Sequence, residues 1–312
     1  MGKPFLTIRQ QVELLEKRGM ETDSETPTIL RREGYYSVVN GYKDPFINRG
    51  ATARASDDRY VRDAKFSNMY ALFEFDRSLR ELTFHYLIRA ESTAKTAVAY
   101  CFSDVHRDRD AYLLQDCYCT RDEYARAGMN AARYADEISG LVSILSKTRR
   151  NSNAEFIKHY RDEYGDVPLW VLSNGLTFGN IEHFFNLMKP DEKASVCKMI
   201  VQSTNRVGSN LGYLSVDKVR VALEALVKFR NICAHDERLY CAVVGGRKQI
   251  NYGRMVWHLE WFLTDAEFNE YIASLVHRLK DGIDGNEKVA AVLEPLGFTE
   301  LSNQLARRWG VN

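Results

Sequence analysis

The feature that most constrains the fold is a run of apolar residues with helical spacing between residues 67 and 100. Its apolar side chains recur at three- and four-residue steps: Leu72, Phe75, Leu79, Leu82, Tyr86, Ala90, Thr93 and Ala97. Because residues at these steps lie on one face of an α-helix, the spacing predicts a long helix with one continuous buried stripe. Other helices must cover that stripe, so the sequence predicts an all-α bundle.

Three further segments extend the helical pattern. A first helix is expected from an N-cap at Thr7 to a stop at Gly19, and another is expected to begin near Ser215. The second of these carries one apolar stripe, formed by Val219, Ala222, Leu223, Leu226, Phe229 and Cys233. At least one more helix is expected near residues 254–280, packed on the others.

Strand-like alternation is scarce outside one stretch, "YCAVVGGRKQINYG" at residues 240–253. Its adjacent glycines, Gly245 and Gly246, predict the turn of a short hairpin. With so little strand pattern the fold class is all-α, and two parts are expected. Residues 1–64 form an N-terminal helical, aromatic-rich segment that packs on an all-α core at residues 65–312.

Composition narrows the classes of function. Of the 312 residues, 45% are hydrophobic and 27% are charged, which indicates a folded globular protein. The formal net charge of +1 argues against a broadly basic nucleic-acid coat but leaves room for a local basic patch. No apolar run reaches the roughly 18 residues of a membrane helix, and the N-terminus lacks a signal-peptide pattern. A cytoplasmic protein without a membrane partner is therefore expected.

The six cysteines include no C-x-x-C pair. The two closest, Cys117 and Cys119, have no further cysteine or histidine at zinc-finger spacing. In the cytosol such thiols stay reduced. The sequence therefore predicts free cysteines, and neither a metal site nor a cofactor.

The stretch "FRNICAHDERLY", at residues 229–240, carries the candidate chemistry. It places Arg230 and His235, two residue types that together can bind a phosphate and move a proton, near the end of an apolar-periodic run. Pairs at this spacing also arise by chance, and Arg80 and His85 form another. The contexts differ, because His85 lies between aromatic and aliphatic residues in mid-helix, where a packed or surface histidine is the default.

On an ideal helix Arg230 and His235 point in directions about 140° apart. They converge on one phosphate only if His235 lies where the helix frays or turns, which the end of the apolar stripe at Cys233 permits. Asn231, His235 and Arg238 share one face, so Asn231 is expected to hydrogen-bond the imidazole. The alternative is that the motif only complements the dipole at a helix C-terminus.

Several segments together resemble a known family. "RNICAHDERL" is similar to the R-N-x-x-A-H-x-x-R-L signature of the Abi-like abortive-infection proteins (the AbiD/AbiF group), which belong to the HEPN superfamily. Other blocks resemble that family in its own order: "KPFLTIRQQVELLEKRG", "GYYSVVNGYKDPF", "FEFDRSLRELTFHYLIRAE" and "PLWVLSNGLTFGNIEHFF". The agreement spans about residues 3–240 and is far more specific than any single motif.

The chain departs from the family pattern at three positions. Asp236 stands where a second histidine often follows the motif histidine, and Cys241 stands where an asparagine is common. Arg89 replaces the first of two glutamates in the long helix, which leaves Glu91. These departures bear on the polarity of the site, while the core Arg–Asn–His set is retained.

The resemblance implies a HEPN-type helical bundle with an N-terminal helical extension, and an endoribonuclease that needs no metal. The ribose 2′-OH attacks the neighbouring phosphorus and leaves a 2′,3′-cyclic phosphate, with Arg230, Asn231 and His235 as catalytic residues. One copy of the motif implies a homodimer with a composite active site. The family relationship also implies a toxin-like role in phage defence, restrained by a small structured RNA or another co-encoded factor. The alternative is a HEPN module that binds RNA without cleaving it.

Supporting roles are expected for charged residues near the motif and on the long helix. Arg238 either contacts the RNA backbone or pairs with Asp236 or Glu237. Glu91 either reaches the site or forms an ordinary helix ion pair with Lys95.

Aromatic residues in the N-terminal part are a further candidate for RNA contact. Tyr36 and Tyr42 either stack unpaired bases, with Lys43 near a phosphate, or belong to the core. Aromatic residues at this density are more often core. Trp170 and Phe178 are expected in the core.

Overall fold

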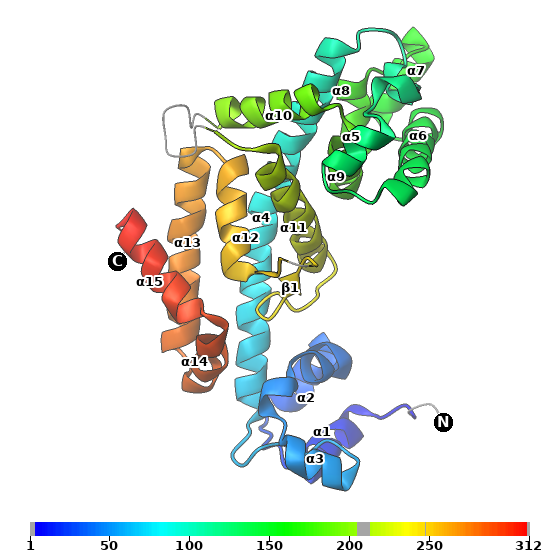
Figure 1. Ribbon diagram of the computed structural model, residues 1–312. Coiled ribbons are helices and arrows are strands. Elements are labelled where there is room, and N and C mark those ends of the chain that lie inside the picture. Colours follow the sequence, from blue (N-terminus) through cyan, green and yellow to red (C-terminus); the bar gives the residue numbers. More distant parts are fainter. Residues whose placement is uncertain (1–3, 205–212, 247, 311–312) are drawn as a thin grey trace. The chain divides into compact units, whose positions relative to one another are not determined.

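Helix α4 (Phe66–Val105) is one continuous helix of 40 residues. It confirms the long helix predicted from residue 67 and continues beyond Tyr100, where that helix was predicted to end. Every residue of its predicted stripe except Thr93 is buried. The computed structural model describes residues 4–204, 213–246 and 248–310, and Figure 1 draws α4 in cyan.

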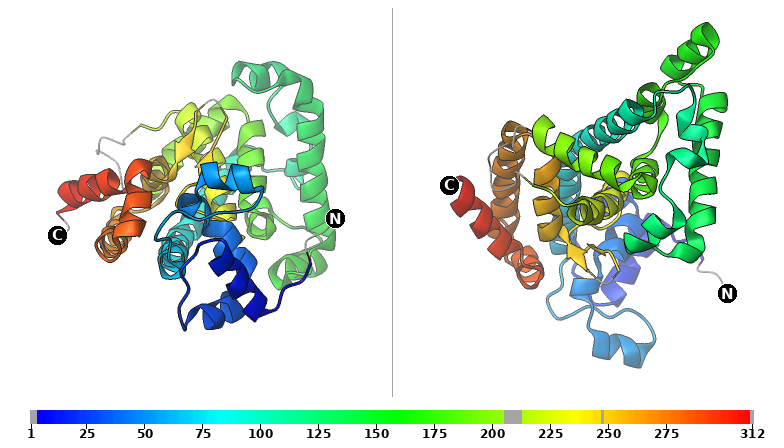
Figure 2. Two further views of the ribbon diagram at one scale, coloured as in Figure 1. Left: turned by 90° about the horizontal axis from the view of Figure 1, so that it is seen from below. Right: turned by 45° about the horizontal axis from the view of Figure 1, so that its top comes forward.

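The described residues are predominantly helical, which confirms the all-α fold class (Figures 1 and 2). Besides α4, the helices are α1 (Ile8–Lys17), α2 (Thr26–Glu33), α3 (Arg49–Ala55), α5 (Arg121–Arg126), α6 (Tyr134–Asn151), α7 (Glu155–Tyr164), α8 (Leu169–Leu172), α9 (Phe178–Leu187), α10 (Pro190–Ser203), α11 (Val216–Ala234), α12 (Tyr252–Leu259), α13 (Asp265–Asp284), α14 (Glu287–Leu293) and α15 (Phe298–Trp309). Single turns of tighter or wider helix are η1 (Tyr36–Asn40), η2 (Asp44–Phe46), η3 (Ala111–Leu113), η4 (Gln115–Cys117), η5 (Ala131–Arg133), η6 (Ser173–Gly175), η7 (Glu260–Phe262) and η8 (Glu294–Leu296).

The chain divides into two units, each built from separate stretches of sequence. The first unit comprises residues 1–82, 236–242 and 272–312, and the second comprises residues 83–235 and 243–271. Helices α4 and α13 therefore contribute residues to both units, and the motif at 229–240 contributes to both as well. The predicted division between residues 64 and 65 stays a prediction.

A buried polar network organises the first unit. The carboxylate of Asp76 on α4 accepts hydrogen bonds from the Tyr42 hydroxyl at 2.7 Å and from the Arg80 guanidinium at 2.6 Å. It also accepts the backbone N–H groups of Leu239 at 3.1 Å and Tyr240 at 2.6 Å. Because Asp76 is fully buried, this network ties the segment 236–242 to the first half of α4.

The C-terminal helices of the first unit cover another side of the same stretch of α4. The rings of Phe75 and Phe298 meet edge to face, with centroids 6.0 Å apart. Gly282, near the end of α13, lies directly against the Phe75 ring, where a larger residue would not fit. Asn286 caps α14 and donates to the side chain of Asn68 at 3.0 Å.

In the second unit, α11 lies beside α9 and α12 (Figures 1 and 2). Its predicted apolar stripe is buried from Val219 to Phe229, whereas Cys233 is half-buried. The buried stripe therefore ends one turn before the end of the helix. The last turn of α11 is left partly exposed.

Capping explains where three of the helices begin. Thr7 forms a capping box at the start of α1, as predicted, and Ser215 caps α11, which begins where a helix start near Ser215 was predicted. The prediction of at least one helix near 254–280 is confirmed, and two helices lie there, because α12 ends at Leu259 and α13 begins at Asp265. Thr264 and Glu267 cap one another there, with the Glu267 carboxylate 2.9 Å from the Thr264 backbone nitrogen, so a new helix starts.

The short hairpin is confirmed within the described residues. Strand β1 (Val243–Val244) pairs antiparallel with β2 (Ile250–Asn251). Gly245 adopts a φ of +92°, a left-handed conformation that favours glycine, and a side chain there would collide with the Lys248 carbonyl.

Candidate active site

His235 lies at the C-terminal end of α11. Its backbone N–H donates to the Asn231 carbonyl at 2.9 Å, and it is the last residue before the chain leaves the helix. Asp236 follows with a φ of 58°, a left-handed conformation that aspartate tolerates better than most residues. His235 is thus at a turning helix end, the condition under which Arg230 and His235 can face one phosphate.

The His235 side chain is exposed, and so is that of Asn231. Among residues 4–204, 213–246 and 248–310, neither side chain forms a hydrogen bond with another side chain. The predicted bond from Asn231 to the imidazole is therefore absent, and the backbone of Asn231 contacts His235 instead. An imidazole in this setting is accessible to a ligand.

Arg230 is held in place from α4. Its Nε lies 3.3 Å from a carboxylate oxygen of Glu91, and its guanidinium carbon lies 5.9 Å from the centre of the Phe84 ring. Glu91 also pairs with Lys95, with 2.8 Å between the charged atoms. Glu91 therefore takes both roles that the sequence left open, the helix ion pair and a contact with the motif.

The two side chains of this ion pair differ in their exposure to solvent. The Glu91 side chain is 9% exposed and that of Arg230 is 28% exposed, so the carboxylate is nearly enclosed while the guanidinium reaches the surface. Glu91 binds Nε, and within the described residues the two terminal nitrogens of Arg230 have no hydrogen-bond partner. A guanidinium anchored in this way can present both terminal nitrogens to a phosphate.

Arg89 stands where the family resemblance suggested a glutamate, and its ion-pair partner belongs to another helix. Its guanidinium lies 2.9 Å from the Glu267 carboxylate at the start of α13. The arginine at this position therefore forms an ion pair with an acidic residue of the second unit. It leaves the Glu91–Arg230 pair undisturbed.

The residues just after the motif histidine have partners that the sequence did not predict. Arg238 pairs with Asp44 at 2.9 Å, so of its two predicted roles the ion pair with Asp236 or Glu237 is wrong, and contact with the RNA backbone stays a prediction. Asp236 pairs instead with Arg80, with 2.5 Å between the charged atoms. Both pairings join residues far apart in the sequence, which spacing within the motif does not reveal.

In the second Arg–His pair, Arg80 and His85, the arginine has a structural role. Arg80 is 3% exposed and bridges Asp76 and Asp236. His85 is exposed on α4 and contacts the Tyr86 ring edge to face. This agrees with the expectation of a packed or surface histidine at that position.

The N-terminal aromatic residues divide between core and surface. Tyr42 is buried, and burial together with the Asp76 carboxylate raises the pKa of its phenol, which therefore stays protonated as a donor to Asp76. Lys43 pairs with Asp58 at 2.5 Å. Tyr36 is 79% exposed, so of the two tyrosines it is the one whose ring is open to solvent.

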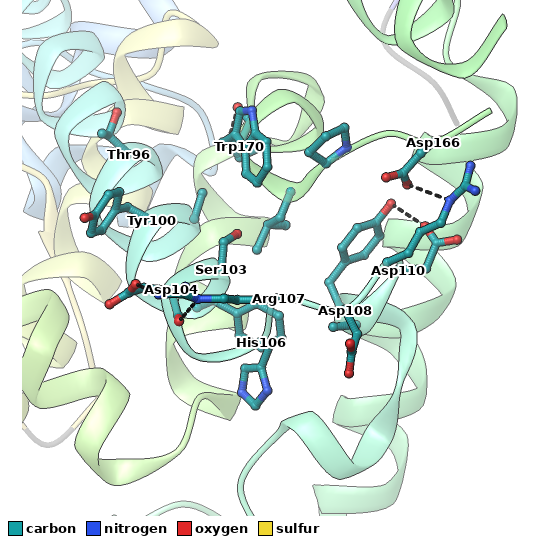
Figure 3. A pocket seen from close by; sticks show the side chains of 18 of the residues that line it. Thr96, Tyr100, Ser103, Asp104, His106, Arg107, Asp108, Asp110, Asp166 and Trp170 are labelled. Atoms are coloured by element: carbon teal, nitrogen blue, oxygen red, sulfur yellow. Dashed lines mark hydrogen bonds and ion pairs between the residues drawn. The ribbon is translucent and has the colours of Figure 1, made fainter. Parts of the chain in front are cut away.

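Trp170 is not a core residue, which corrects the prediction, whereas Phe178 is buried as predicted. Trp170 lies on the one-turn helix α8, where Leu169, Val171 and Leu172 face inward and leave it 58% exposed. Figure 3 shows it at the edge of a cavity of about 640 Å³ within the second unit. The rim of this cavity carries four aspartates: Asp104, Asp108, Asp110 and Asp166.

Neither a metal-binding cluster nor a membrane-spanning helix occurs in the described part of the chain. Within it, no three His, Cys, Asp or Glu side chains lie together as a metal-binding group. All six cysteines lie in the described part of the chain and none is joined in a disulfide there, as predicted. No helix of residues 4–204, 213–246 and 248–310 has the length and apolar composition needed to cross a membrane.

Sequence reasoning missed the structural importance of Asp76 and Arg80. The signal was present in "FEFDRSLRELTFH", where an acidic and a basic residue four apart interrupt an apolar helix. A buried ion pair in such a position must find further partners. Here the partners are the residues that directly follow His235.

Comparison with known proteins gives one match. A family model described as Abi-like protein matches residues 28–241. No curated protein and no solved structure matches the chain. Because the matched region covers more than half of the 312 residues and contains Arg230 and His235, the chain belongs to the family of Abi-like proteins.

Proposed function

We propose that this Abi-like protein is a HEPN-type endoribonuclease that cuts RNA without a metal ion and acts in abortive-infection phage defence. The observation that carries the proposal is the arrangement at the end of α11. An anchored guanidinium, Arg230, and an exposed imidazole, His235, lie within the last turns of one helix, and the helix turns at His235.

Proton transfer in this reaction falls to His235. The ribose 2′-OH loses a proton as its oxygen bonds to phosphorus, and the bond from phosphorus to the 5′-oxygen breaks as that oxygen gains a proton. Histidine is suited to both transfers because an imidazole changes charge near neutral pH. The products are a 2′,3′-cyclic phosphate and a 5′-hydroxyl.

Arg230 stabilises the charge that builds on the phosphoryl oxygens. Glu91 engages only its Nε, the side chain is 28% exposed, and a guanidinium stays charged throughout the reaction. Glu91 is a positioning residue, because it holds Nε and leaves the terminal nitrogens to the substrate. DNA lacks the 2′-OH and does not react by this route.

The proposal includes a homodimer with a composite site. One imidazole cannot remove one proton and deliver another at the same instant, so two Arg–His sets facing one phosphate complete the chemistry. A two-fold axis beside the end of α11 brings two such sets together. Sedimentation at micromolar concentration is expected to give a dimer, and a monomer with full activity would refute this part.

The family name supports a role in abortive infection, in which RNA cleavage halts the growth of an infected cell. Such an activity has to be restrained between infections. A small structured RNA or a co-encoded factor, bound to a basic surface, supplies that restraint in the proposal.

The test is cleavage of mixed RNA by the purified protein in excess EDTA. Wild type is expected to cut, and His235→Ala and Arg230→Ala are expected to lose the activity. His85→Ala is the matched control, because His85 is also an exposed histidine of the second unit and also follows an arginine by five positions.

The outcomes separate the proposal from its alternative. Cleavage that survives both motif substitutions would point to a contaminant or another site and would overturn the proposal. Binding of RNA without cleavage by all four proteins would instead establish the non-cleaving RNA-binding module.

A further inference from the structure

The exposed face of α11 carries a second feature, away from Arg230. Residues at three- and four-residue steps follow this face from one end of the helix to the other: Asp217, Val221, Glu224, Lys228, Asn231 and His235. None of them is buried. The face therefore runs without interruption from the first turn of α11 to the candidate catalytic histidine.

A pocket lies at the N-terminal end of this face, and we call it the tryptophan pocket. It has a volume of about 360 Å³ and is lined by Val221 from α11, Ile250 from β2, and two partly exposed tryptophans, Trp257 and Trp261. Three cations also line it: Lys218, Lys248 and Arg254. All of these residues belong to the second unit.

The charge of the tryptophan pocket suits an anion. Asp217, the acidic residue among the described residues that line it, is 80% exposed and pairs with Arg220 at 3.3 Å. His258 also lines the pocket, and burial with Arg254 nearby lowers the pKa of its imidazole, so the ring is neutral at pH 7. The positive charge of the pocket thus comes from three long, solvent-facing side chains.

A second hollow continues the tryptophan pocket along α11. Its volume is about 250 Å³, and it shares Val221, Lys248 and Ile250 with the first. It adds Arg220 and the turn glycines of the hairpin, with Glu224 as its acidic residue. Glu224 pairs with Lys228 at 2.7 Å, so a lysine on the same face of α11 balances the negative charge of Glu224.

The larger cavity beside Trp170 is less suited to the same ligand. Four aspartates line it (Figure 3), and its cationic lining residues are Lys95, Arg107 and Arg109. Arg107 pairs with Asp104 at 2.9 Å, so that arginine is already engaged. A polyanion is therefore favoured at the tryptophan pocket and disfavoured at the cavity of Figure 3.

We propose that the tryptophan pocket binds an unpaired nucleotide of single-stranded RNA. Trp261 stacks on the base, beside Trp257 in the pocket wall, and Lys218, Lys248 and Arg254 contact the neighbouring phosphates. The inference rests on the proposed function for the identity of the ligand as RNA. It adds where the strand is held and which part of it is recognised.

The tryptophan pocket borders the same helix, α11, that ends at the candidate catalytic histidine, His235, so the distance between them can be calculated. Val221 and His235 are separated by about 21 Å along the axis of α11, given a rise of 1.5 Å per residue. A strand lying on the exposed face reaches His235 within a few nucleotides. The tryptophan pocket therefore sets the register between the bound base and the linkage that is cut.

Charge reversal tests the phosphate contacts. Binding of a short, unstructured, fluorescein-labelled oligoribonucleotide is measured by anisotropy on a His235→Ala background, so that cleavage plays no part. The double variant K218E/K248E is expected to bind at least about tenfold more weakly, with a salt dependence shallower by about 1.4, since each phosphate contact to a single strand contributes roughly 0.7.

The matched control is K158E/K198E, which makes the same change in net charge at two exposed lysines of α7 and α10 in the same unit. It is expected to keep the affinity within a small factor of the parent. Equal weakening by both double variants would overturn the assigned site, because it would reflect net charge alone.

Tryptophan substitutions test the stacking. Trp261→Ala is expected to weaken binding between about fivefold and a hundredfold, the usual range for loss of one stacked aromatic, whereas Trp261→Phe retains most of the affinity. RNA is expected to quench the intrinsic fluorescence of wild type and of Trp170→Phe alike, and to quench Trp261→Phe less. Quenching that disappears in Trp170→Phe would place the base in the cavity of Figure 3 and overturn the proposal.

A backbone-only competitor separates RNA from other anions. Inorganic polyphosphate or an acidic peptide that competes as well as the oligoribonucleotide would overturn the stacking claim and indicate a general anion site. The result is independent of the nuclease test. Binding at this pocket without any cleavage refutes only the proposed function, and cleavage with unchanged binding in K218E/K248E and Trp261→Ala refutes only the inference.

Discussion

Replacing Asp76 with alanine is expected to destabilise the protein more than any loss of an exposed ion pair. Asp76 is fully buried and Arg80 is 3% exposed, so the substitution leaves a guanidinium in the interior with Asp236 as its remaining carboxylate. It also removes the acceptor for the Tyr42 hydroxyl and for two backbone N–H groups, those of Leu239 and Tyr240.

The size of the effect follows from these losses. Removing one partner of a buried ion pair costs about 3–5 kcal/mol, and each buried donor left unpaired costs about 1–3 kcal/mol. The losses share one network and do not add fully, so the free energy of unfolding is expected to fall by about 4–6 kcal/mol. That is a large share of the roughly 5–15 kcal/mol that stabilises a typical domain.

Urea unfolding followed by circular dichroism measures this effect as a lower midpoint. The control is Asp44→Ala, which removes the pair with Arg238, whose two side chains are 63% and 40% exposed, and is expected to cost less than about 1 kcal/mol. If Asp76→Ala fails to fold, Asp76→Leu combined with Arg80→Met is expected to restore a folded protein, because no buried charge remains. Equal midpoints for Asp76→Ala and Asp44→Ala would refute the reasoning.

Three other outcomes are expected from the same structure. Glu91→Gln is expected to slow RNA cleavage about tenfold with little change in RNA affinity, because Arg230 loses its charged anchor; single-turnover rates measured beside a binding curve check this. Gly282→Ala is expected to lower the free energy of unfolding by about 1–3 kcal/mol in a urea titration, since the new methyl group overlaps the Phe75 ring. Thr264→Ala is expected to cost about 1 kcal/mol in the same assay through loss of the α13 cap, whereas Ser195→Ala, an exposed serine in mid-helix, is expected to change little.

Local patterns in the sequence predicted much of the fold. The apolar spacing from Leu72 to Ala97 and the caps at Thr7 and Ser215 depend on residues within one or two turns of each other, so they can be read without knowledge of the fold. The break between α12 and α13 was also local, in the Thr264–Glu267 capping box, but the apolar periodicity on either side masked it.

The contacts of the candidate site were harder to predict because they join distant parts of the chain. Arg238 pairs with Asp44, and Asp236 with Arg80, in each case more than a hundred positions away. Many acidic residues were available as partners, so spacing within the motif favoured the wrong ones. Trp170 shows the same limit, since its residue type indicates burial while its exposure depends on which neighbours cover it.

The sequence predicted that Arg230 and His235 converge only if the helix frays or turns at His235. An ideal helix separates Arg230 and His235, and the sequence indicated only that the apolar stripe stops at Cys233. The structure supplies the missing feature, a helix that ends at His235 and a carboxylate, Glu91, that anchors Arg230 from another helix. The predicted hydrogen bond from Asn231 to the imidazole is wrong, whereas the catalytic role of Asn231 and the homodimer stay predictions.

The most direct test of the central claim is the chemistry of the cut ends. RNA incubated with the purified protein in EDTA is analysed by mass spectrometry, beside an identical RNA with a single 2′-deoxy substitution at the mapped cleavage position. We expect a 2′,3′-cyclic phosphate and a 5′-hydroxyl from the first RNA and no cut at the substituted position in the second. Fragments with 3′-hydroxyl and 5′-phosphate ends, or cleavage at the deoxy position, would contradict the proposed mechanism.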